Sequence, residues 1–460
     1  MAQRLARSFS SKPLARSQTF NGRLFGAPEE AWVSKQVIAC IAVVLAEATY
    51  NSVMYPILPF MVEDLLLPGP TSDAIITFNT GLLAATFCLG QLFSLILWGH
   101  LWEVIGRKNV ILLGLCGNAV TACLFATSSS YTWALIFRFI GGLLNCSLFV
   151  VRSYALEVLE GNDRVRAFKC LGIIWSLGVM LGPEIGGLLS RPNTHIPILF
   201  AQGAFWEMYP YLLPIILVAV ATLVVVGIVM VYLPPVATVR KVKFKNESDK
   251  ELNLTLVLAL SVGVFTSFTD LFPLWAKANE SQGGLELTDP FTIGQIQSFG
   301  SLVAVLVQCS LLNSENDILI IKATWAIFVP IICLFPFAQE ISLYFTWPFL
   351  AALYSCFSIT QMLVLSRLYL ALTHESWSTL SSSAHYFTAI SKTLFTFLFS
   401  SALAWSYDHP FPFDFHLPYF VLAVVGLVCV VLIYPAKQAK KGTETQAMHQ
   451  FLLDEYNSKA

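Results

Sequence analysis

The chain has 460 residues, of which 56% are hydrophobic and only 12% carry a charge. Soluble domains have about 25% charged residues, so a soluble body of this length would lack the polar surface it needs. The formal net charge of −1 also excludes the concentrated basic excess of a nucleic-acid-binding protein. The composition therefore predicts a membrane protein with many spans.

Apolar runs recur along the chain at the length of about 20 residues that a helix needs to cross a bilayer. The amino half is expected to contain six such helices, at residues 36–61, 74–98, 109–128, 132–151, 168–189 and 208–233. After a polar stretch, the carboxyl half is expected to contain six more, at residues 254–275, 292–312, 318–337, 343–370, 378–405 and 417–434. The predicted fold class is an all-α membrane protein with twelve transmembrane helices in two six-helix bundles.

The basic residues are confined to alternate connections between these runs. The amino tail, the even-numbered loops and the carboxyl tail hold Lys and Arg, whereas the odd-numbered loops hold only Arg191 and Lys277. Since cytoplasmic loops keep Lys and Arg, both termini are predicted to be cytoplasmic. The expected organisation is a cytoplasmic amino tail (1–35), an amino-terminal bundle (36–233), a cytoplasmic linker (234–253), a carboxyl-terminal bundle (254–434) and a cytoplasmic tail (435–460).

Some properties of the chain are left open by its sequence. The Arg- and Ser-rich amino tail has the composition of a positive-inside tail and also of an organelle transit peptide. The plasma membrane and a vacuolar or other endomembrane are both compatible with it. The ten cysteines lie within or at the ends of apolar runs and form no CxxC pair, so neither a metal site nor a cofactor is expected. No HExxH or GxSxG motif is present, and an enzyme is not expected.

The loop after the second run combines glycines with charges. Gly99 allows two helices to approach closely, and Gly106 permits a turn that a side chain would hinder. An acid, Glu103, precedes two bases, Arg107 and Lys108, and these groups are expected to form an ionic latch at the cytoplasmic rim.

This loop resembles the Gly-x-x-x-Asp-x-x-Gly-Arg-Lys/Arg signature of the major facilitator superfamily, with Glu103 in place of the usual Asp. Two further signatures follow in order. Arg138 to Gly142 is similar to the family's Arg-x-x-x-Gly element, which the resemblance associates with proton coupling. The fifth run is similar to the antiporter signature of the drug:proton antiporter branch, at Gly178, Gly182, Pro183, Gly186 and Gly187.

Other parts of the chain extend the resemblance. Gly90-Gln91 in the second run is a further match, and Phe272 to Trp275 is similar to fungal and plant zinc-induced-facilitator-like transporters. The second copy of the loop signature, expected after the eighth run, is missing, because residues 313–322 contain acids but no Gly or Arg. A symmetric latch on that half is therefore not expected.

Ionisable residues inside apolar runs are costly, at about 2.5–3.5 kcal/mol near the bilayer centre, so each needs a partner or a function. Glu47 and Asn51 share one helix face, Arg138 and Asn145 share another, and His385 and Lys392 share a third. Asp270 is predicted to lie near the outer end of the seventh run, where interfacial water lowers the free-energy cost of an acidic side chain. The residues expected to form the substrate or proton pathway are Glu47, Asn51, Arg138, Asn145, Glu184, Gln361, His385 and Lys392.

Each of these residues also has a structural interpretation. Glu47 and Asn51 could form a hydrogen-bonded packing patch, and Glu184 could form a salt bridge with Arg138 or Lys392. The preferred hypothesis is a monomeric alternating-access transporter that moves a small organic solute by proton-coupled antiport. An uncoupled facilitator and a transporter-like receptor or sensor are the alternatives. The expected partners are the solute, protons and the lipid bilayer, and the residues do not identify the solute.

Overall fold

The computed structural model describes most of the chain between the two terminal segments. The described residues are 35–67, 69, 72–158, 161–195, 200, 204–233, 249–337, 343–371 and 377–433. The predicted amino tail, the predicted carboxyl tail and most of the predicted linker lie outside these residues.

The amino half is a set of long apolar helices with short connections. Its elements are α2 (Lys35–Ser52), α3 (Leu58–Leu66), α4 (Asp73–Ile105), α5 (Arg107–Ala126), α6 (Tyr131–Leu144), α7 (Ser147–Val158), α8 (Gly161–Leu189), α9 (Pro192–His195), α10 (Ala204–Met208) and α11 (Leu212–Tyr232).

The carboxyl half repeats this organisation. Its elements are α12 (Asp249–Lys277), the 3₁₀ turn η1 (Glu280–Gln282), α13 (Pro290–Ser310), α14 (Asp317–Leu334), the 3₁₀ turn η2 (Phe335–Phe337), α16 (Leu343–Ala371), α17 (Trp377–Ser406) and α18 (Leu417–Ile433). α12 begins at Asp249, inside the predicted linker, because the helix continues beyond its apolar part.

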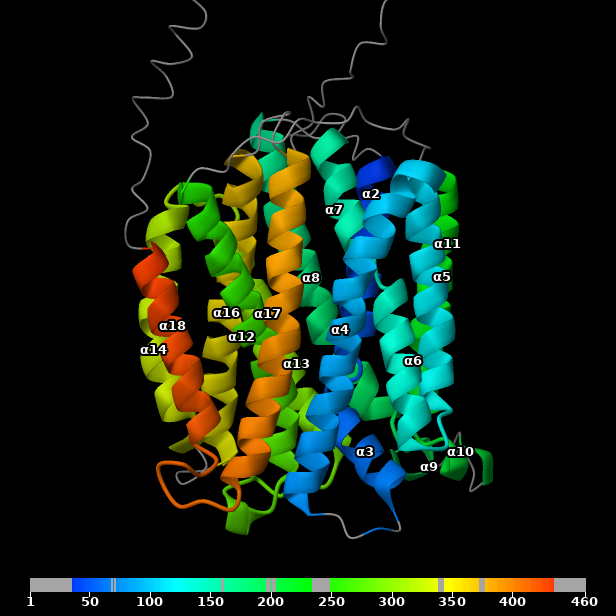
Figure 1. Ribbon diagram of the computed structural model, residues 1–460, viewed down its shortest axis with the longest axis vertical. Helices are drawn as coiled ribbons and strands as arrows, with labels where there is room; N and C mark the ends of the chain where they lie inside the picture. Colours follow the sequence, from blue (N-terminus) through cyan, green and yellow to red (C-terminus); the bar gives the residue numbers. More distant parts are fainter. Residues whose placement is uncertain are drawn as a thin grey trace, which may run out of the picture.

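Within the described part of the chain, ten helices are long and apolar enough to cross a membrane, and two shorter apolar helices, Gln36–Ser52 and Leu417–Ile433, bring the number to twelve. They run lengthwise side by side, and α11 ends and α12 begins at the same end of the molecule (Figure 1). We call this end the linker face and the other end the opposite face. The observed architecture is the predicted all-α membrane fold.

Two predicted helices are interrupted. The expected helix at 132–151 is two helices, since α6 ends at Leu144 and α7 begins at Ser147. The expected helix at 36–61 contains turns at residues 53–57 between α2 and α3. In the first case the backbone of Asn145 leaves the helical region, with φ −80° and ψ 81°. This break places the Asn145 side chain in the interior of the protein.

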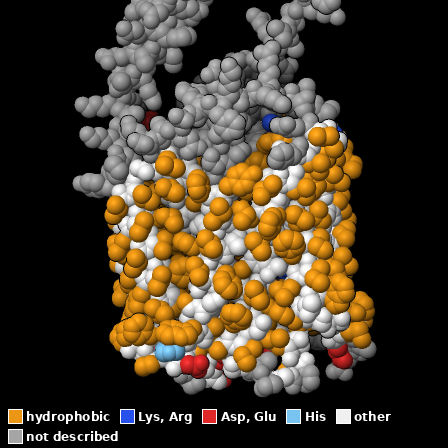
Figure 2. All heavy atoms as spheres, viewed as in Figure 1, with side chains coloured by type: hydrophobic (Ala, Val, Ile, Leu, Met, Phe, Trp, Pro, Cys, Tyr) orange, Lys and Arg blue, Asp and Glu red, His pale blue; other side chains and the backbone are white. Residues whose placement is uncertain are grey.

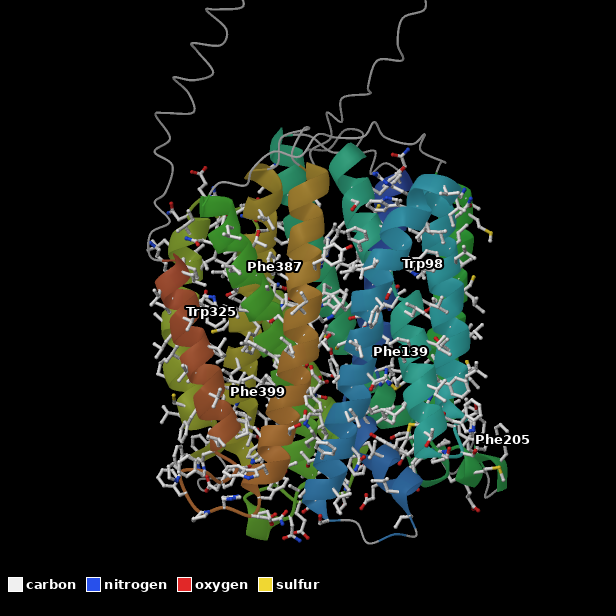
Figure 3. All side chains as sticks on the ribbon, in the orientation of Figure 1. Trp98, Phe139, Phe205, Trp325, Phe387 and Phe399 are labelled. Atoms are coloured by element: carbon white, nitrogen blue, oxygen red, sulfur yellow. The ribbon has the colours of Figure 1, made fainter. Side chains whose placement is uncertain are left out.

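The outer surface of the bundle suits a lipid environment. Hydrophobic side chains cover the region between the two ends in the view of Figure 2, and acidic side chains are visible near the lower end. Exposed apolar residues such as Val231 and Phe387 belong to this band. Other large rings are internal: Trp98 and Trp325 pack between helices (Figure 3), and the Trp98 indole donates a hydrogen bond to the Leu143 carbonyl, 2.9 Å.

The two halves meet along three helix pairs, α8 with α13, α8 with α16 and α4 with α17. Glycines permit the first and the last of these contacts. A Cβ on Gly187 would meet the backbone of Pro290 and Phe291 in α13, and one on Gly81 would meet Ser400 in α17. These contacts hold the halves side by side and leave a central space between them.

Candidate functional site

A cavity of about 170 Å³ lies between the two halves. One water needs about 10–15 Å³ on a comparable measure, so the cavity has room for several waters or a small solute. Six of the eight predicted pathway residues line it: Asn51, Arg138, Asn145, Gln361, His385 and Lys392.

Glu47 lies directly behind the cavity wall and is 1% exposed. Asn118 Nδ2 of α5 donates a hydrogen bond to its Oε1 at 3.0 Å, and Asn145 Nδ2 donates to its Oε2 at 2.8 Å. No basic side chain forms an ion pair with Glu47 among the described residues. The hydrogen bonds to the carboxylate thus come from amide donors, one of them at the break between α6 and α7.

A chain of hydrogen bonds connects Glu47 to Lys392 of the other half. Lys392 Nζ donates to Gln91 Oε1 at 3.1 Å, and Gln91 Nε2 donates to Asn145 Oδ1 at 3.1 Å. Asn145 then donates to Glu47. We call Lys392, Gln91, Asn145 and Glu47 the amide relay. Gln91 was outside the predicted site, although the Gly90-Gln91 match to the family drew attention to this position.

Arg138 is 8% exposed and makes no hydrogen bond or ion pair within the described part of the chain. Its guanidinium lies over the ring of Phe125, 4.4 Å from the centroid, and near that of Phe87, at 5.4 Å. Its Nε is buried without an acceptor. Cation–π contacts compensate only part of the hydration that a buried guanidinium loses, so Arg138 has unused donor capacity facing the cavity.

Asp270, which was predicted near the outer end of the seventh run, lies seven residues before the end of α12 and lines the same cavity. It accepts a hydrogen bond from Thr396 Oγ1 at 3.2 Å, and the charges of Arg138 and Lys392 act on it. α12 continues past Asp270 to Lys277. Arg152 of α7 also lines the cavity.

Glu184 is not among the residues that line the cavity, and the ion pair with Arg138 or Lys392 is not formed. The backbone carbonyl of its neighbour Pro183 lies close to Gly294 of α13. This turn of α8 therefore lies at the contact between the halves. His385 and Gln361 do line the cavity. The His385 ring packs edge to face against Phe149 at 4.7 Å, and Gln361 Nε2 is buried without a partner.

The glycines of the fifth span form a packing surface. A Cβ on Gly178, Gly182 or Gly186 would meet Ala48, Ser52 or Val53 of the first span. The Ser52 hydroxyl donates to the Gly178 carbonyl at 3.1 Å. Close approach of α8 to α2 fixes the position of the turn that carries Glu47.

The loop signature lies at the linker face between α4 and α5. Gly106 has φ +83°, a conformation that side chains disfavour, and caps both helices. Arg107 stacks over the Trp102 ring at 5.0 Å, and Lys108 Nζ donates to the Met230 carbonyl near the end of α11, at 2.7 Å. A Cβ atom added at Gly99 would have no neighbouring heavy atom within 4 Å. The Glu103 side chain, and with it the predicted latch, lies outside the described residues.

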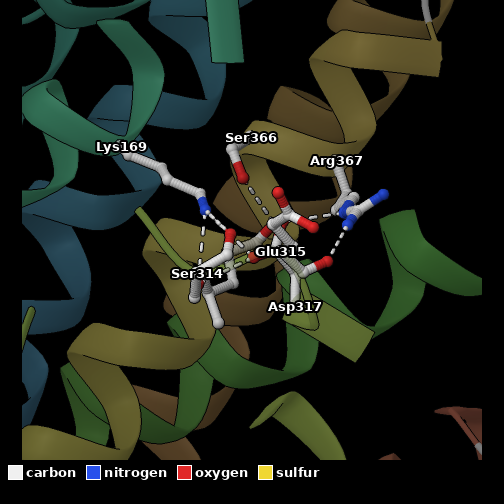
Figure 4. Close-up of polar contacts among 7 residues, drawn as sticks. Lys169, Ser314, Glu315, Asp317, Ser366 and Arg367 are labelled. Atoms are coloured by element: carbon white, nitrogen blue, oxygen red, sulfur yellow. Dashed lines mark hydrogen bonds and ion pairs between the residues drawn. The ribbon is translucent and has the colours of Figure 1, made fainter. Parts of the chain in front are cut away.

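The carboxyl half nevertheless has a latch at this face. Asp317 is 2% exposed and accepts from Lys169 Nζ of α8 at 2.9 Å and from Arg367 Nε of α16 at 2.8 Å. Ser314 Oγ donates to it as well, at 3.0 Å (Figure 4). We call Lys169, Asp317 and Arg367 the linker-face clasp. The clasp is not the symmetric latch that the missing loop signature would have formed, because its bases come from α8 and α16 and not from the loop before α14. Lys169 is a buried residue of α8.

A second group of polar contacts joins the halves at the opposite face. Lys277 Nζ of α12 lies 2.9 Å from Glu63 Oε2 of α3. The backbone N–H of Asn279 donates to Asp73 Oδ2 at 3.0 Å. Polar contacts between the halves therefore lie on both sides of the cavity.

This arrangement, with a polar cavity between two helical halves and charged contacts at both ends, is that of a membrane transporter. Residues 39–391 match the family model of the Major Facilitator Superfamily, and the chain belongs to that family. Its members are transporters and not enzymes.

The relatives support the drug:proton antiporter-like branch. The chain is 28% identical to Protein ZINC INDUCED FACILITATOR-LIKE 1 of Arabidopsis thaliana over 60% of this chain and 63% of that protein. It is 27% identical to the major facilitator superfamily multidrug transporter mfsB of Aspergillus fumigatus, over 50% of this chain and 37% of that protein. The matched region thus spans less than two thirds of the length of these relatives.

A solved structure confirms the fold. The human organic anion transporter MFSD10 (TETRAN) superimposes with a TM-score of 0.67 at 15% identity, covering 87% of this chain and 99% of that one. At this identity the similarity concerns the fold.

Proposed function

We propose that the protein moves a small organic solute across a membrane by proton-coupled antiport, with Glu47 as the proton-binding carboxyl. The observation that carries this proposal is the amide relay, which links a buried acid of the amino half to a cation of the carboxyl half. A charge change at Glu47 can therefore act on a contact between the halves.

The direction of each hydrogen bond in the relay is determined by its ends. A lysine ammonium can only donate, and a carboxylate can only accept. Gln91 must therefore turn its carbonyl toward Lys392, and Asn145 must turn its amide nitrogen toward Glu47. The relay as observed is satisfied by an ionised Glu47, both of whose oxygens accept from amides.

Protonation reverses this requirement. A protonated Glu47 gains an O–H donor, for which the carbonyls of Asn118 and Asn145 are the neighbouring acceptors, and the proposed coupling uses Asn145. If Asn145 turns its carbonyl to Glu47, its amide nitrogen faces Gln91, which must then offer its own carbonyl and lose the acceptor for Lys392. Proton binding thus weakens the link between α4 and α17 and favours rearrangement of the halves.

The two groups of contacts around the cavity provide the gates for alternating access. Opening the linker face requires separation of Lys169 from Asp317, and opening the opposite face requires separation of Lys277 from Glu63. Rocking of two bundles about a central site exchanges one set of contacts for the other.

The linker face is proposed to be cytoplasmic. Bases cluster there, including Arg107, Lys108 and Arg166, whereas the described part of the opposite face has Arg191 and Lys277. This distribution follows the positive-inside rule. The amino and carboxyl tails would then also lie in the cytoplasm.

The proposal can be tested with purified protein in proteoliposomes with an acidic lumen. The probes are 2-naphthalenesulfonate, neutral 2-naphthalenesulfonamide and 2-naphthyltrimethylammonium, which share one ring system and differ in charge. We expect the pH gradient to drive accumulation of at least one probe. Glu47→Gln, which cannot ionise, should abolish this accumulation and retain exchange of the probe in the absence of a gradient.

The matched control is Glu280→Gln, which removes an exposed acid at the opposite face and should behave as wild type. Accumulation by Glu47→Gln at the wild-type rate would contradict the role of Glu47. Exchange of a probe without any response to the gradient would indicate an uncoupled facilitator.

A further inference from the structure

The charges around the central cavity are unequal. The described lining contains the cations Arg138, Arg152 and Lys392 but a single acid, Asp270. Glu47 lies behind the wall, with both oxygens accepting from amides. A solute that enters the cavity therefore touches more basic than acidic side chains among the described residues.

Two of these cations lack an anionic partner. Arg138 has no hydrogen-bond acceptor or ion pair in the described structure although it is 8% exposed. Lys392 is half-buried and has one neutral acceptor, Gln91, with no carboxylate of the described residues within ion-pair distance. Charges away from bulk water are normally paired, so a buried and a half-buried cation without an anion in one cavity indicate a site for an anion.

Asp270 does not neutralise this excess. Its charge interacts with both Arg138 and Lys392 but forms an ion pair with neither, and Thr396 is its hydrogen-bond partner. An organic cation in the cavity would lie beside Arg138 and Lys392, for which the described structure shows no ion pair. Repulsion from these two bases in a cavity of low dielectric disfavours a cation relative to an anion of the same shape.

The remainder of the lining is largely apolar and includes aromatic rings. Phe87, Phe149 and Trp175 come from the amino half, and Phe265 comes from the carboxyl half. Rings on both sides of a cavity suit a flat apolar body. The Nε2 group of Gln361 is buried without a partner and offers a further donor.

We propose that the solute is an organic monoanion with an aromatic body, whose carboxylate or sulfonate group binds between Arg138 and Lys392. This inference rests on the proposed function, because it assigns the solute of the same transport cavity. Arg138 belongs to the amino half and Lys392 to the carboxyl half, so one anionic group contacts both halves and stabilises the state in which the cavity is closed.

The test is binding of the three naphthalene probes to the purified full-length protein in detergent, measured by calorimetry. We expect 2-naphthalenesulfonate to bind at least tenfold more tightly than the sulfonamide, as expected for one charge-assisted hydrogen bond. 2-Naphthyltrimethylammonium should bind more weakly than either. Tighter binding of the cation, or equal binding of all three probes, would overturn the proposal.

Substitutions locate the anion. Arg138→Met and Lys392→Met should each weaken binding of the sulfonate at least tenfold and leave binding of the sulfonamide nearly unchanged. Arg166→Gln removes an exposed base of the linker face and should bind as wild type. If Arg138→Met and Lys392→Met lost neither affinity nor selectivity for the sulfonate, the anion would not be bound by these residues. The ligand series on the wild-type protein tests the proposal independently of whether a variant folds.

Binding and transport separate the two proposals. Selective binding of the sulfonate without accumulation under a pH gradient supports the anion site and contradicts proton coupling. Accumulation of the cation, with no binding of the sulfonate, supports the transporter and contradicts the anion site.

Discussion

The linker-face clasp makes a quantitative prediction about the balance between conformations. Lys169→Met removes the ammonium that joins α8 to Asp317 and retains an apolar stem of similar length. The carboxylate keeps its bonds from Arg367 and Ser314 in the carboxyl half. The substitution thus removes a contact between the halves without leaving Asp317 unpaired.

The magnitude follows from the burial of the pair. Both side chains are 3% exposed, and their atoms are 2.9 Å apart. A hydrogen bond to a charged group contributes about 1.5–3 kcal/mol, and the lower desolvation cost of Met offsets part of this value. We therefore expect a shift of about 1–2 kcal/mol toward states open at the linker face, which is about 5- to 30-fold in their population.

The assay measures access to the cavity from each end. Leu365 and Leu58 both line the cavity, on α16 and α3. Single cysteines at these positions, in a background without native cysteines, are labelled with a polar maleimide. The Lys169→Met change should raise the labelling rate at residue 365 in proportion to the open population and should not raise it at residue 58.

The control is Arg166→Met, which removes a base one helical turn away that is exposed. Lys169→Arg should restore the wild-type labelling rate, because arginine can donate to the same carboxylate. Equal labelling of wild type and Lys169→Met at residue 365 would refute the conclusion that this ion pair holds the halves together.

Three further predictions concern packing, backbone and the opposite face. Gly182→Val places a side chain against Ser52 and should lower stability by about 1–3 kcal/mol, visible as a lower melting temperature in detergent; an unchanged value would contradict the close packing of α8 on α2. Gly106→Ala forces alanine to φ +83° and should cost about 1–3 kcal/mol in the same measurement, whereas Gly99→Ala, where space is open, should cost less than half of this. Lys277→Gln should change labelling of a cysteine at residue 58 by less than about fivefold, because Glu63 is 34% exposed and exposed ion pairs contribute only about 0.2–1 kcal/mol; a larger change would show that this contact contributes more than an exposed ion pair.

The class of the protein and the positions of its helices follow from local properties of the chain. A helix needs about 20 residues to cross the bilayer, and hydropathy is averaged over a window of that length. Each span is therefore recognisable without knowledge of its neighbours. Arg138 and Lys392 are likewise recognisable from the sequence, because a base within an apolar run stands out whatever the packing of that run. The predicted site therefore contains six residues that line the cavity.

Partners depend on how helices pack, which no single run determines. The relay needs Gln91 of α4, and Glu47 of α2 also accepts from Asn118 of α5. Both are ordinary polar residues until packing brings these helices together. The clasp likewise joins Lys169 to Asp317, 148 residues apart in the chain. Glu184, as conspicuous an acid as Glu47, lies at a different contact.

The sequence by itself determined that this is a twelve-helix membrane protein with a few buried charges, because the cost of placing charge in lipid acts on each residue separately. Only the tertiary structure decided which charges are paired and which are not, since pairing depends on distances of about 3 Å between helices whose rotation and depth are set by packing. Because Lys169 is paired with Asp317, it has a role in holding the halves together. Arg138 and Lys392 form no ion pair in the described structure and are available for a solute.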